Sequence, residues 1–259
     1  MSTGNPANSA LFETTFQALQ GQGPLKTWSL IVTIFGDIAP ARDGLIDSQL
    51  LAALTAPFGV KPEALRVALH RLRKDGWLEA VKTGRRSAYH LSPTGEALTR
   101  AAYARIYRAP ESRRADWQIT LVEDATREAK AGSVAIGPNI LVAPATPAAP
   151  LALAAEDVPD WMRAALMPPE ALVEFSLYTK ALRPVLNAAS GVTLCAQDRL
   201  ALRLLVLHTW RRIILRQPEL PEALLGEDWA GFEARRLTHA LFEALPRVSL
   251  CELAALQNA

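Results

Sequence analysis

The sequence predicts an α+β protein that is mostly helical. Two observations lead to this fold class. Long stretches in the first and last thirds repeat their apolar residues at helical spacing, whereas short segments near residues 77–91 and 117–142 alternate as half-buried strands do. The chain has 259 residues, 50% of them hydrophobic, which allows one large domain or two to three small ones with a sizeable core.

Several classes of protein are disfavoured by composition. No apolar run approaches the length that spans a bilayer, and residues 1–20 lack a basic segment followed by an apolar one. Cys195 and Cys251 lie far apart, without a metal-ligand pattern near them. We therefore expect a cytoplasmic protein with free thiols, no membrane contact, no metal and no cofactor.

The segment from Leu45 to Leu91 is the most informative part of the sequence. Its first helix is expected from about Asp47 to Ala56. Asp47 or Ser48 can accept hydrogen bonds from the free N–H groups of the first turn. Pro57 and Gly59 then end the helix. The apolar stripe of this helix consists of Leu50, Leu51 and Leu54.

A second helix is expected from Pro62 to about Gly76, since proline suits the first helical position and glycine the end. Its two sides differ sharply in character. One side, which must pack on the preceding helix, has Leu65, Ala68, Leu69 and Leu72. The other has Glu63, Arg66, Val67, His70 and Lys74, with Arg71 and Arg73 at the flanks.

Two strand-like runs follow, Trp77 to Val81 and Ala88 to Leu91. Between them lies a basic tip with a glycine, Lys82 to Ser87, as expected of a hairpin. Tyr89 and Leu91 alternate with Ala88 and His90, as in a half-buried strand.

A helix, a turn, a second helix and a basic hairpin in this order predict a winged helix-turn-helix that binds DNA. Arg66 can contact a guanine with two hydrogen bonds, worth roughly 1–3 kcal/mol of discrimination, and Val67 can touch a thymine methyl. Hairpin cations would hold backbone phosphates. The candidate DNA-binding residues are Arg66, Val67, His70, Arg71, Arg73, Lys74, Lys82, Arg85 and Arg86. The alternative for each residue is an ordinary solvated surface position.

The charge distribution agrees with this hypothesis. The chain has a net charge of +2, but residues 25–115 contain 15 Lys and Arg against 8 Asp and Glu, which leaves the remainder acidic. A basic module joined to an acidic remainder is typical of DNA-binding proteins with a second functional part.

The flanking segments extend the helical prediction. Residues 25–38 are almost wholly apolar and predict a buried helix, with a buried strand as the alternative because of their β-branched residues. Another helix is expected from Pro93 to about Arg108, capped by Ser92. Residues 1–23 are weakly helical, and the alternative there is a mobile arm.

The remaining chain divides into two parts. Strands at 117–122 and 140–142 around a helix at 126–131 predict a small α+β unit, and the Pro/Ala-rich residues 143–155 a surface connection. Helices are expected at 169–189, 196–216 and 229–245, with a short one from Val248, and Pro218 and Pro221 separate the second from the third. The predicted domains are residues 25–108, 109–158 and 159–259.

Four stretches resemble the PaaX family of bacterial transcriptional regulators, which repress phenylacetate catabolism. They are SLIVTIFG with Asp37, the segment ALRVALHRLRKDGWLEAVKTGRRSAY, the segment Trp117 to Val122 with the later GPNILVAP, and HTWRRIILRQPELPEALLGEDW. Together they run through most of the chain in the family's order. Gly226 departs from the pattern, since a proline commonly stands there.

The resemblance implies a homodimeric repressor with an N-terminal winged helix, a small ferredoxin-like middle domain and a helical C-terminal domain for effector binding and dimerisation. It also implies release from operator DNA by an aryl-acyl-CoA, typically phenylacetyl-CoA.

Candidate effector-binding residues are His208, Arg211, Arg212 and Trp229. Arginines suit the phosphates of an acyl-CoA and a tryptophan suits an aromatic tail. The alternative is structural: the arginines would pair with acidic C-terminal helices, and Trp229 would belong to the core.

Three other functions stay open, although we expect a regulator and not an enzyme. Glu123 and Asp124 follow a strand and could serve a metal-dependent nuclease. His208 could act as the base of a thioester hydrolase, but no hydrolase motif accompanies it. A winged helix can also serve protein contacts alone.

Overall fold

A computed structural model describes residues 6–20, 23–83, 86–110, 117–129, 132–144, 158–167, 169–189, 194–217, 220, 222–226, 229–250 and 252–253. The helices are α1 (Pro6–Gln20), α2 (Thr27–Ile38), α3 (Ser48–Thr55), α4 (Pro62–Lys74), α5 (Pro93–Ile106), α6 (Ala125–Glu128), α7 (Asp160–Leu166), α8 (Pro169–Ala189), α9 (Ala196–Arg216) and α10 (Ala230–Ala244), with 3-10 helices η1 (Ala56–Phe58) and η3 (Glu222–Leu225). The strands are β1 (Ile46–Asp47), β2 (Leu78–Thr83), β3 (Arg86–Leu91), β4 (Trp117–Leu121), β5 (Val134–Gly137) and β6 (Ile140–Pro144).

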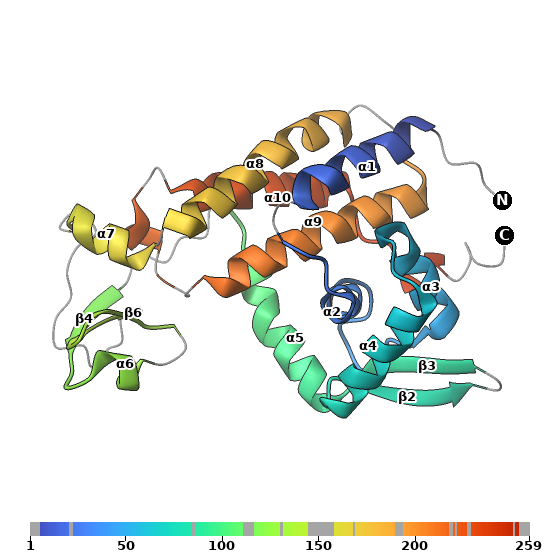
Figure 1. The fold of residues 1–259 in the computed structure, drawn as a ribbon, viewed down its shortest axis with the longest axis horizontal. Helices are drawn as coiled ribbons and strands as arrows, with labels where there is room; N and C mark the ends of the chain where they lie inside the picture. Colours follow the sequence, from blue (N-terminus) through green and yellow to red (C-terminus); the bar gives the residue numbers. More distant parts are fainter. Residues whose placement is uncertain are drawn as a thin grey trace.

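The predominantly helical α+β class is confirmed. In Figure 1 the long helices α8 and α9 cross the molecule, and α2 to α5 with the β2–β3 hairpin lie at the opposite end from the β4–β6 sheet. None of the helices in the described part of the chain is long and apolar enough to cross a membrane.

Helix α2 is the centre of the N-terminal unit. The alternative of a buried strand is wrong, because α2 packs against α3, α4 and α9 and is buried from Ser29 to Phe35. Packing on several sides buries the apolar side chains of this helix, and this outweighs the strand preference of its β-branched residues.

Helices α3 and α4 follow the sequence prediction closely. The carboxylate of Asp47 caps α3 by accepting hydrogen bonds from the N–H groups of Gln49 and Leu50, both at 2.8 Å. Pro57 lies within η1, and Gly59 ends that turn with φ +71°, a left-handed conformation that favours glycine. Helix α4 ends at Lys74, and Gly76, just beyond the C-cap residue Asp75, has the same left-handed conformation with φ +73°.

The β2–β3 hairpin is longer than predicted, since its strands extend to Thr83 and Arg86. The simple alternation expected for β3 is wrong at Ala88, which is buried like Leu91. Strand β1 pairs with the outer edge of β3 and sets Asp47 opposite Ala88, so a third strand covers this position.

Helix α5 begins where predicted. The Ser92 hydroxyl accepts a hydrogen bond from the Gly95 N–H at 2.9 Å and caps the helix. Gly95 lies so close to the backbone of Trp77 that any side chain there would overlap the Trp77 carbonyl oxygen. This contact fixes α5 against the base of the hairpin.

The middle unit is a three-stranded antiparallel sheet of order β4-β6-β5. Strands β4 and β5 both pair with β6, which is the split βαβ arrangement. The sequence analysis missed β5. A ferredoxin-like fold adds a second helix and a fourth strand; α7 packs on β5, and no fourth strand joins this sheet among the residues described. The ferredoxin-like assignment therefore stays a prediction.

Helices α8 and α9 begin and end at the residues predicted from the sequence. Trp229 precedes α10 as its N-cap residue, and residues 250, 252 and 253 are helical, near the expected final helix. The expected connection at 143–155 lies largely outside the described residues, as do Pro218 and Pro221. Cys195 is exposed and free, whereas Cys251 is outside the described residues.

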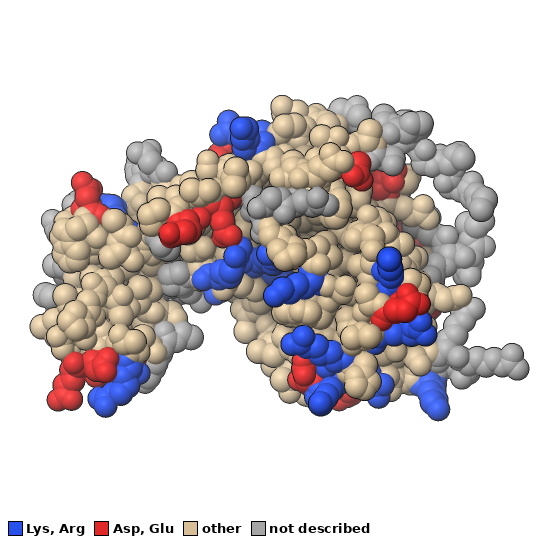
Figure 2. All heavy atoms as spheres, in the orientation of Figure 1, with Lys and Arg blue, Asp and Glu red and all other residues tan. Residues whose placement is uncertain are grey.

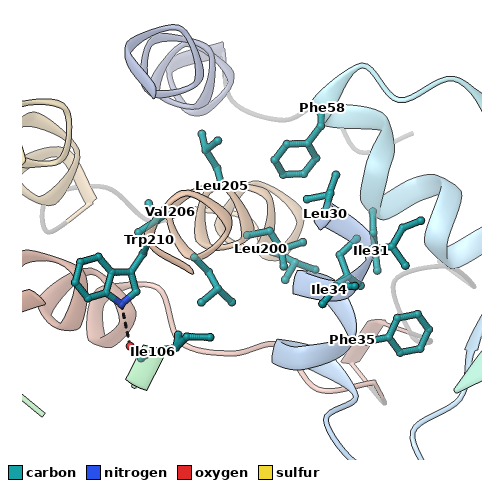
Figure 3. Close-up of a cluster of buried hydrophobic side chains, with 14 of the residues drawn as sticks. Leu30, Ile31, Ile34, Phe35, Phe58, Ile106, Leu200, Leu205, Val206 and Trp210 are labelled. Carbon is teal, nitrogen blue, oxygen red and sulfur yellow. Dashed lines mark hydrogen bonds between the residues drawn. The ribbon is translucent and has the colours of Figure 1, made fainter. Parts of the chain in front are cut away.

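The N-terminal and C-terminal helices share one hydrophobic core. Figure 3 shows Leu30 and Ile34 of α2 on the side of Leu200 of α9, and the Trp210 indole N–H donating to the Ile106 carbonyl at the end of α5. Helix α7 instead contributes to a second, smaller core with Trp117 and Val142 of the sheet. Helix α9 is thus packed directly against the unit that carries α4.

Candidate nucleic-acid interface and effector site

The outer face of α4 is fully exposed, as the sequence predicts. Leu65, Ala68, Leu69 and Leu72 are buried, whereas Glu63, Arg66, Val67, His70, Arg71, Arg73 and Lys74 are exposed. Val67 leaves 69% of its surface in solvent, which is high for a β-branched hydrophobic residue. An exposed face that mixes cations with an apolar side chain has the composition of a base-reading helix.

Two arginines of α4 form solvated ion pairs. Arg66 pairs with Glu63 at 3.0 Å, and Arg71 pairs with Asp75 at 3.4 Å. Exposed pairs of this kind contribute about 0–1 kcal/mol, so the guanidinium groups can change partners at little cost. They are available for phosphate or base contacts.

The hairpin continues the basic surface. Lys82 of β2 is exposed, Arg85 lies outside the described residues, and the side chain of Arg86 is also not described. A groove between α4 and β2 is lined by His70, Arg73, Lys74 and Glu79. Figure 2 shows Lys and Arg side chains, with acidic ones among them, over the end of the molecule that carries α4 and the hairpin.

Three of the four candidate effector residues come together on α9. His208 is only 2% exposed, and its Nδ1 lies 3.1 Å from the Thr33 hydroxyl of α2. Arg211 donates to the same hydroxyl at 3.2 Å and to the Ser29 hydroxyl and carbonyl at 2.6 and 3.1 Å. Arg212 donates to the Gly23 carbonyl at 3.3 Å. These residues join α9 to the beginning of α2.

Arg211 is a partly buried cation whose contacts in the described chain are all to neutral groups. Burial, together with the positive charge of Arg212, lowers the pKa of Arg211 to about 10. A buried charge without a counter-ion is costly, and strongly perturbed ionisable groups cluster at functional sites. The expected pairing of Arg211 with acidic helices is not what the structure has.

Trp229 lies in a different environment from the other three. It is 8% exposed and packs edge to face against Phe175 and Phe232, with ring centroids 5.4 and 5.0 Å away. Phe175 in turn contacts Trp210, which lies on the side of α9 away from His208. Trp229 thus has the core position that the sequence left as its alternative.

His208 is poorly suited to general-base catalysis. Burial, together with the positive charges of Arg211 and Arg212, lowers its pKa to about 3. A general base works best when its pKa is near the working pH. Asp124, the candidate nuclease residue, instead accepts a hydrogen bond from the Arg127 N–H at 3.0 Å and caps α6. Neither enzymatic alternative gains support.

The α2 side of this arrangement was not predicted from the sequence. Ser29, Thr33 and Asp37 are buried polar residues spaced four apart, and they form one stripe along α2. Arg211 and His208 contact the first two, and Arg203 contacts Asp37. Three polar residues at helical spacing in an apolar helix are the signal that could have revealed it.

A helix with an exposed basic face beside a hairpin, both carried on a helical body, defines a candidate nucleic-acid-binding protein. Comparison with known proteins places the chain in a family: the model of the PaaX-like proteins matches residues 26–95, and that of the PaaX-like protein C-terminal domain matches residues 170–251. The chain belongs to the PaaX family. It is similar to the transcriptional repressor PaaX of Escherichia coli (strain K12), with 29% identity over 274 residues that cover 92% of this chain and 86% of the relative.

Proposed function

We propose that this protein is a DNA-binding transcriptional regulator, a repressor of an aromatic-acid operon of the phenylacetate type. Helix α4 is its recognition helix and the β2–β3 hairpin its wing, in a winged helix-turn-helix. The observation that carries the proposal is the exposed outer face of α4, on which Arg66, Val67 and His70 follow one another along one side. The family and the repressor to which the chain is similar support this reading.

The roles within the interface follow from side-chain chemistry. Arg66 and Val67 contact base edges near the middle of α4, since arginine matches guanine and valine matches the thymine methyl. Arg71, Arg73, Lys74 and Lys82 contact phosphates, together with Arg85 and Arg86 at the tip. A homodimer supplies two such modules to half-sites one helical turn apart, which gives specificity beyond that of one module.

Charge reversal tests the interface. Lys74→Glu on α4 and Lys82→Glu on the hairpin are expected to weaken binding to every duplex and to flatten its salt dependence. Lys180→Glu, an exposed lysine of α8, is the matched control. If the α4 and hairpin variants bind DNA as tightly as the control, the module serves protein contacts instead.

We further propose that an aryl-acyl-CoA, such as phenylacetyl-CoA, releases the protein from DNA by binding at the α2–α9 junction. Arg211 and Arg212 would hold anionic groups of the effector, and a shift of α9 against α2 would be passed directly to the unit that carries α4. Calorimetric titration with phenylacetyl-CoA tests this. Arg212→Ala is expected to weaken binding at least tenfold, because one charge-assisted hydrogen bond contributes about 1.5–3 kcal/mol. Arg216→Ala, one turn further along, is the control and should bind normally.

A further inference from the structure

A cavity of about 250 Å³ lies between α1, residues 23–25 and α9. Phe16, Leu19, Leu25 and Leu205 give it an apolar lining, and His208 and Arg212 add polar groups from α9. An apolar cavity of roughly 150 Å³ can hold a benzene ring, so this one has room for a substituted ring.

The hydrogen bonds around Thr33 decide which nitrogen of His208 carries the proton. The Thr33 hydroxyl has one hydrogen, which it donates to the Ser29 carbonyl at 3.0 Å. Its oxygen must therefore accept at its other contacts, from Arg211 Nε at 3.2 Å and from His208 Nδ1 at 3.1 Å. In the neutral imidazole, this places the proton on Nδ1 and leaves Nε2 as an acceptor.

That acceptor has no partner in the described part of the chain. His208 Nε2 is buried and makes no hydrogen bond there, although His208 lines the cavity. Buried polar atoms are almost always paired, and an unpaired one on a residue that lines a cavity is a group that a ligand in that cavity would complete. The neutral ring cannot pair with a carboxylate at this nitrogen, because both would be acceptors.

We propose that this cavity binds an apolar ring or chain that carries an O–H or N–H group and donates a hydrogen bond to His208 Nε2. Burial and the neighbouring guanidinium groups keep the imidazole neutral, which preserves the acceptor at ordinary pH. This ligand would be the effector of the proposed function, or a part of it. Only the connection between ligand binding and release from DNA rests on that proposed function. The donor can come from an amide of the CoA arm of a thioester or from the hydroxyl of a free aryl acid.

The first test compares two probes of similar shape, phenol and anisole, on the full-length protein. Phenol can donate a hydrogen bond, whereas anisole can only accept. Phenol is expected to bind on the order of tenfold more tightly and to shift the ¹⁵N resonance of His208 Nε2, which is traceable because the chain has only four histidines. Equal binding of the two probes, or binding without a shift at His208, would overturn the proposal.

Two variants locate the binding. Leu25→Trp fills the cavity from the half-buried residues before α2 and should abolish phenol binding, whereas Leu45→Trp, on an exposed position outside it, should leave binding intact. Circular dichroism checks that both variants fold. If Leu25→Trp is folded and still binds phenol, the cavity is not the site.

A second experiment separates the two sources of the donor. Phenylacetyl-CoA and 4-hydroxyphenylacetate are each added while the His208 resonance is followed, and the compound that moves it identifies the source. DNA binding is measured separately on the same samples. A protein that binds the probes at His208 but never binds DNA would contradict the proposed function and leave the cavity assignment standing. Failure of both compounds and of phenol to move the resonance would overturn the cavity assignment itself.

Discussion

Arg203 and Asp37 form a buried ion pair with two parallel hydrogen bonds. Arg203 Nε donates to Asp37 Oδ2 at 2.7 Å, and its terminal nitrogen donates to Oδ1 at 2.9 Å. The two side chains are 3% and 1% exposed. Arg247 and the Tyr107 hydroxyl also donate to Oδ1, at 3.0 and 2.9 Å. One carboxylate thus joins α2 to α9, to the end of α5 and to the chain beyond α10.

Removing Arg203 should destabilise the whole protein. Arg203→Ala leaves Asp37 buried with only Arg247 and Tyr107, and breaking a buried pair typically costs about 3–5 kcal/mol. Arg236→Ala, which breaks an exposed pair with Glu233, should cost about 0–1 kcal/mol. Chemical denaturation of both variants gives the comparison. Similar losses in the two would show that the pair contributes little.

The same pair predicts an acid-sensitive stability. Burial raises the pKa of Asp37, but the hydrogen bonds and charge of Arg203, with Arg247 and Tyr107, outweigh it and hold that pKa below its ordinary value of 3.8. Because the folded pKa is depressed, the contribution is present above the unfolded pKa and is lost as pH falls through the folded pKa. The free energy of unfolding should therefore fall more steeply below pH 3.8 in the wild type than in Asp37→Asn. Parallel pH profiles would contradict this.

Substitutions that remove a base contact and those that remove a phosphate contact on α4 should affect DNA binding differently. Arg66→Ala is expected to cost about 1–3 kcal/mol on the preferred site and to relax preference at one position, whereas Lys74→Ala should weaken all duplexes and reduce the salt slope by about 1. Arg236→Ala is the control, because Arg236 is also an exposed arginine that pairs with a glutamate three residues earlier on its own helix. Equal losses of Arg66→Ala on specific and random DNA would reject the base contact.

Val67 should matter for DNA and not for folding. Its side chain is largely in solvent, so Val67→Ser is expected to change the free energy of unfolding by no more than about 0.5 kcal/mol. The same change should reduce preference for a thymine at one position in a selection of random duplexes. An unchanged selected sequence would remove Val67 from the interface.

Gly95 should tolerate no side chain. A methyl group there overlaps the Trp77 carbonyl oxygen, so Gly95→Ala should cost about 1–3 kcal/mol by thermal or chemical unfolding. Gly36→Ala is the matched control: its added methyl group would lie 3.6 Å from Thr99, an ordinary contact, and alanine favours the helix. A harmless Gly95→Ala would mean that the hairpin and α5 are less tightly joined than described.

Local patterns predicted much of the fold. The limits of α8 and α9 and the buried face of α4 follow from apolar periodicity and from prolines and caps, which act over a few residues. Strand β5 was missed because Val134–Gly137 is too short to show an alternation. The burial of Ala88 depends on β1, a strand of two residues that pairs across the chain.

Only part of the candidate site could be predicted, again because sequence patterns act over a few residues. The outer face of α4 is a property of one helix, so its exposure could be read from spacing. The contacts of His208 and Arg211 join α9 to residues of α2 more than 170 positions earlier. Local residue spacing cannot predict contacts between residues so far apart in the sequence. Trp229 was grouped with them because a tryptophan suits an aromatic tail, although it packs against Phe175 and Phe232 on another side of α9.

The central claim is that this protein binds operator DNA and leaves it when an aryl-acyl-CoA binds. The most direct test is fluorescence anisotropy of a labelled duplex from upstream of its own operon, titrated with the protein with and without phenylacetyl-CoA. We expect tight, salt-sensitive binding that the thioester releases and that free phenylacetate and CoA do not. No binding to any upstream fragment at low salt would contradict it.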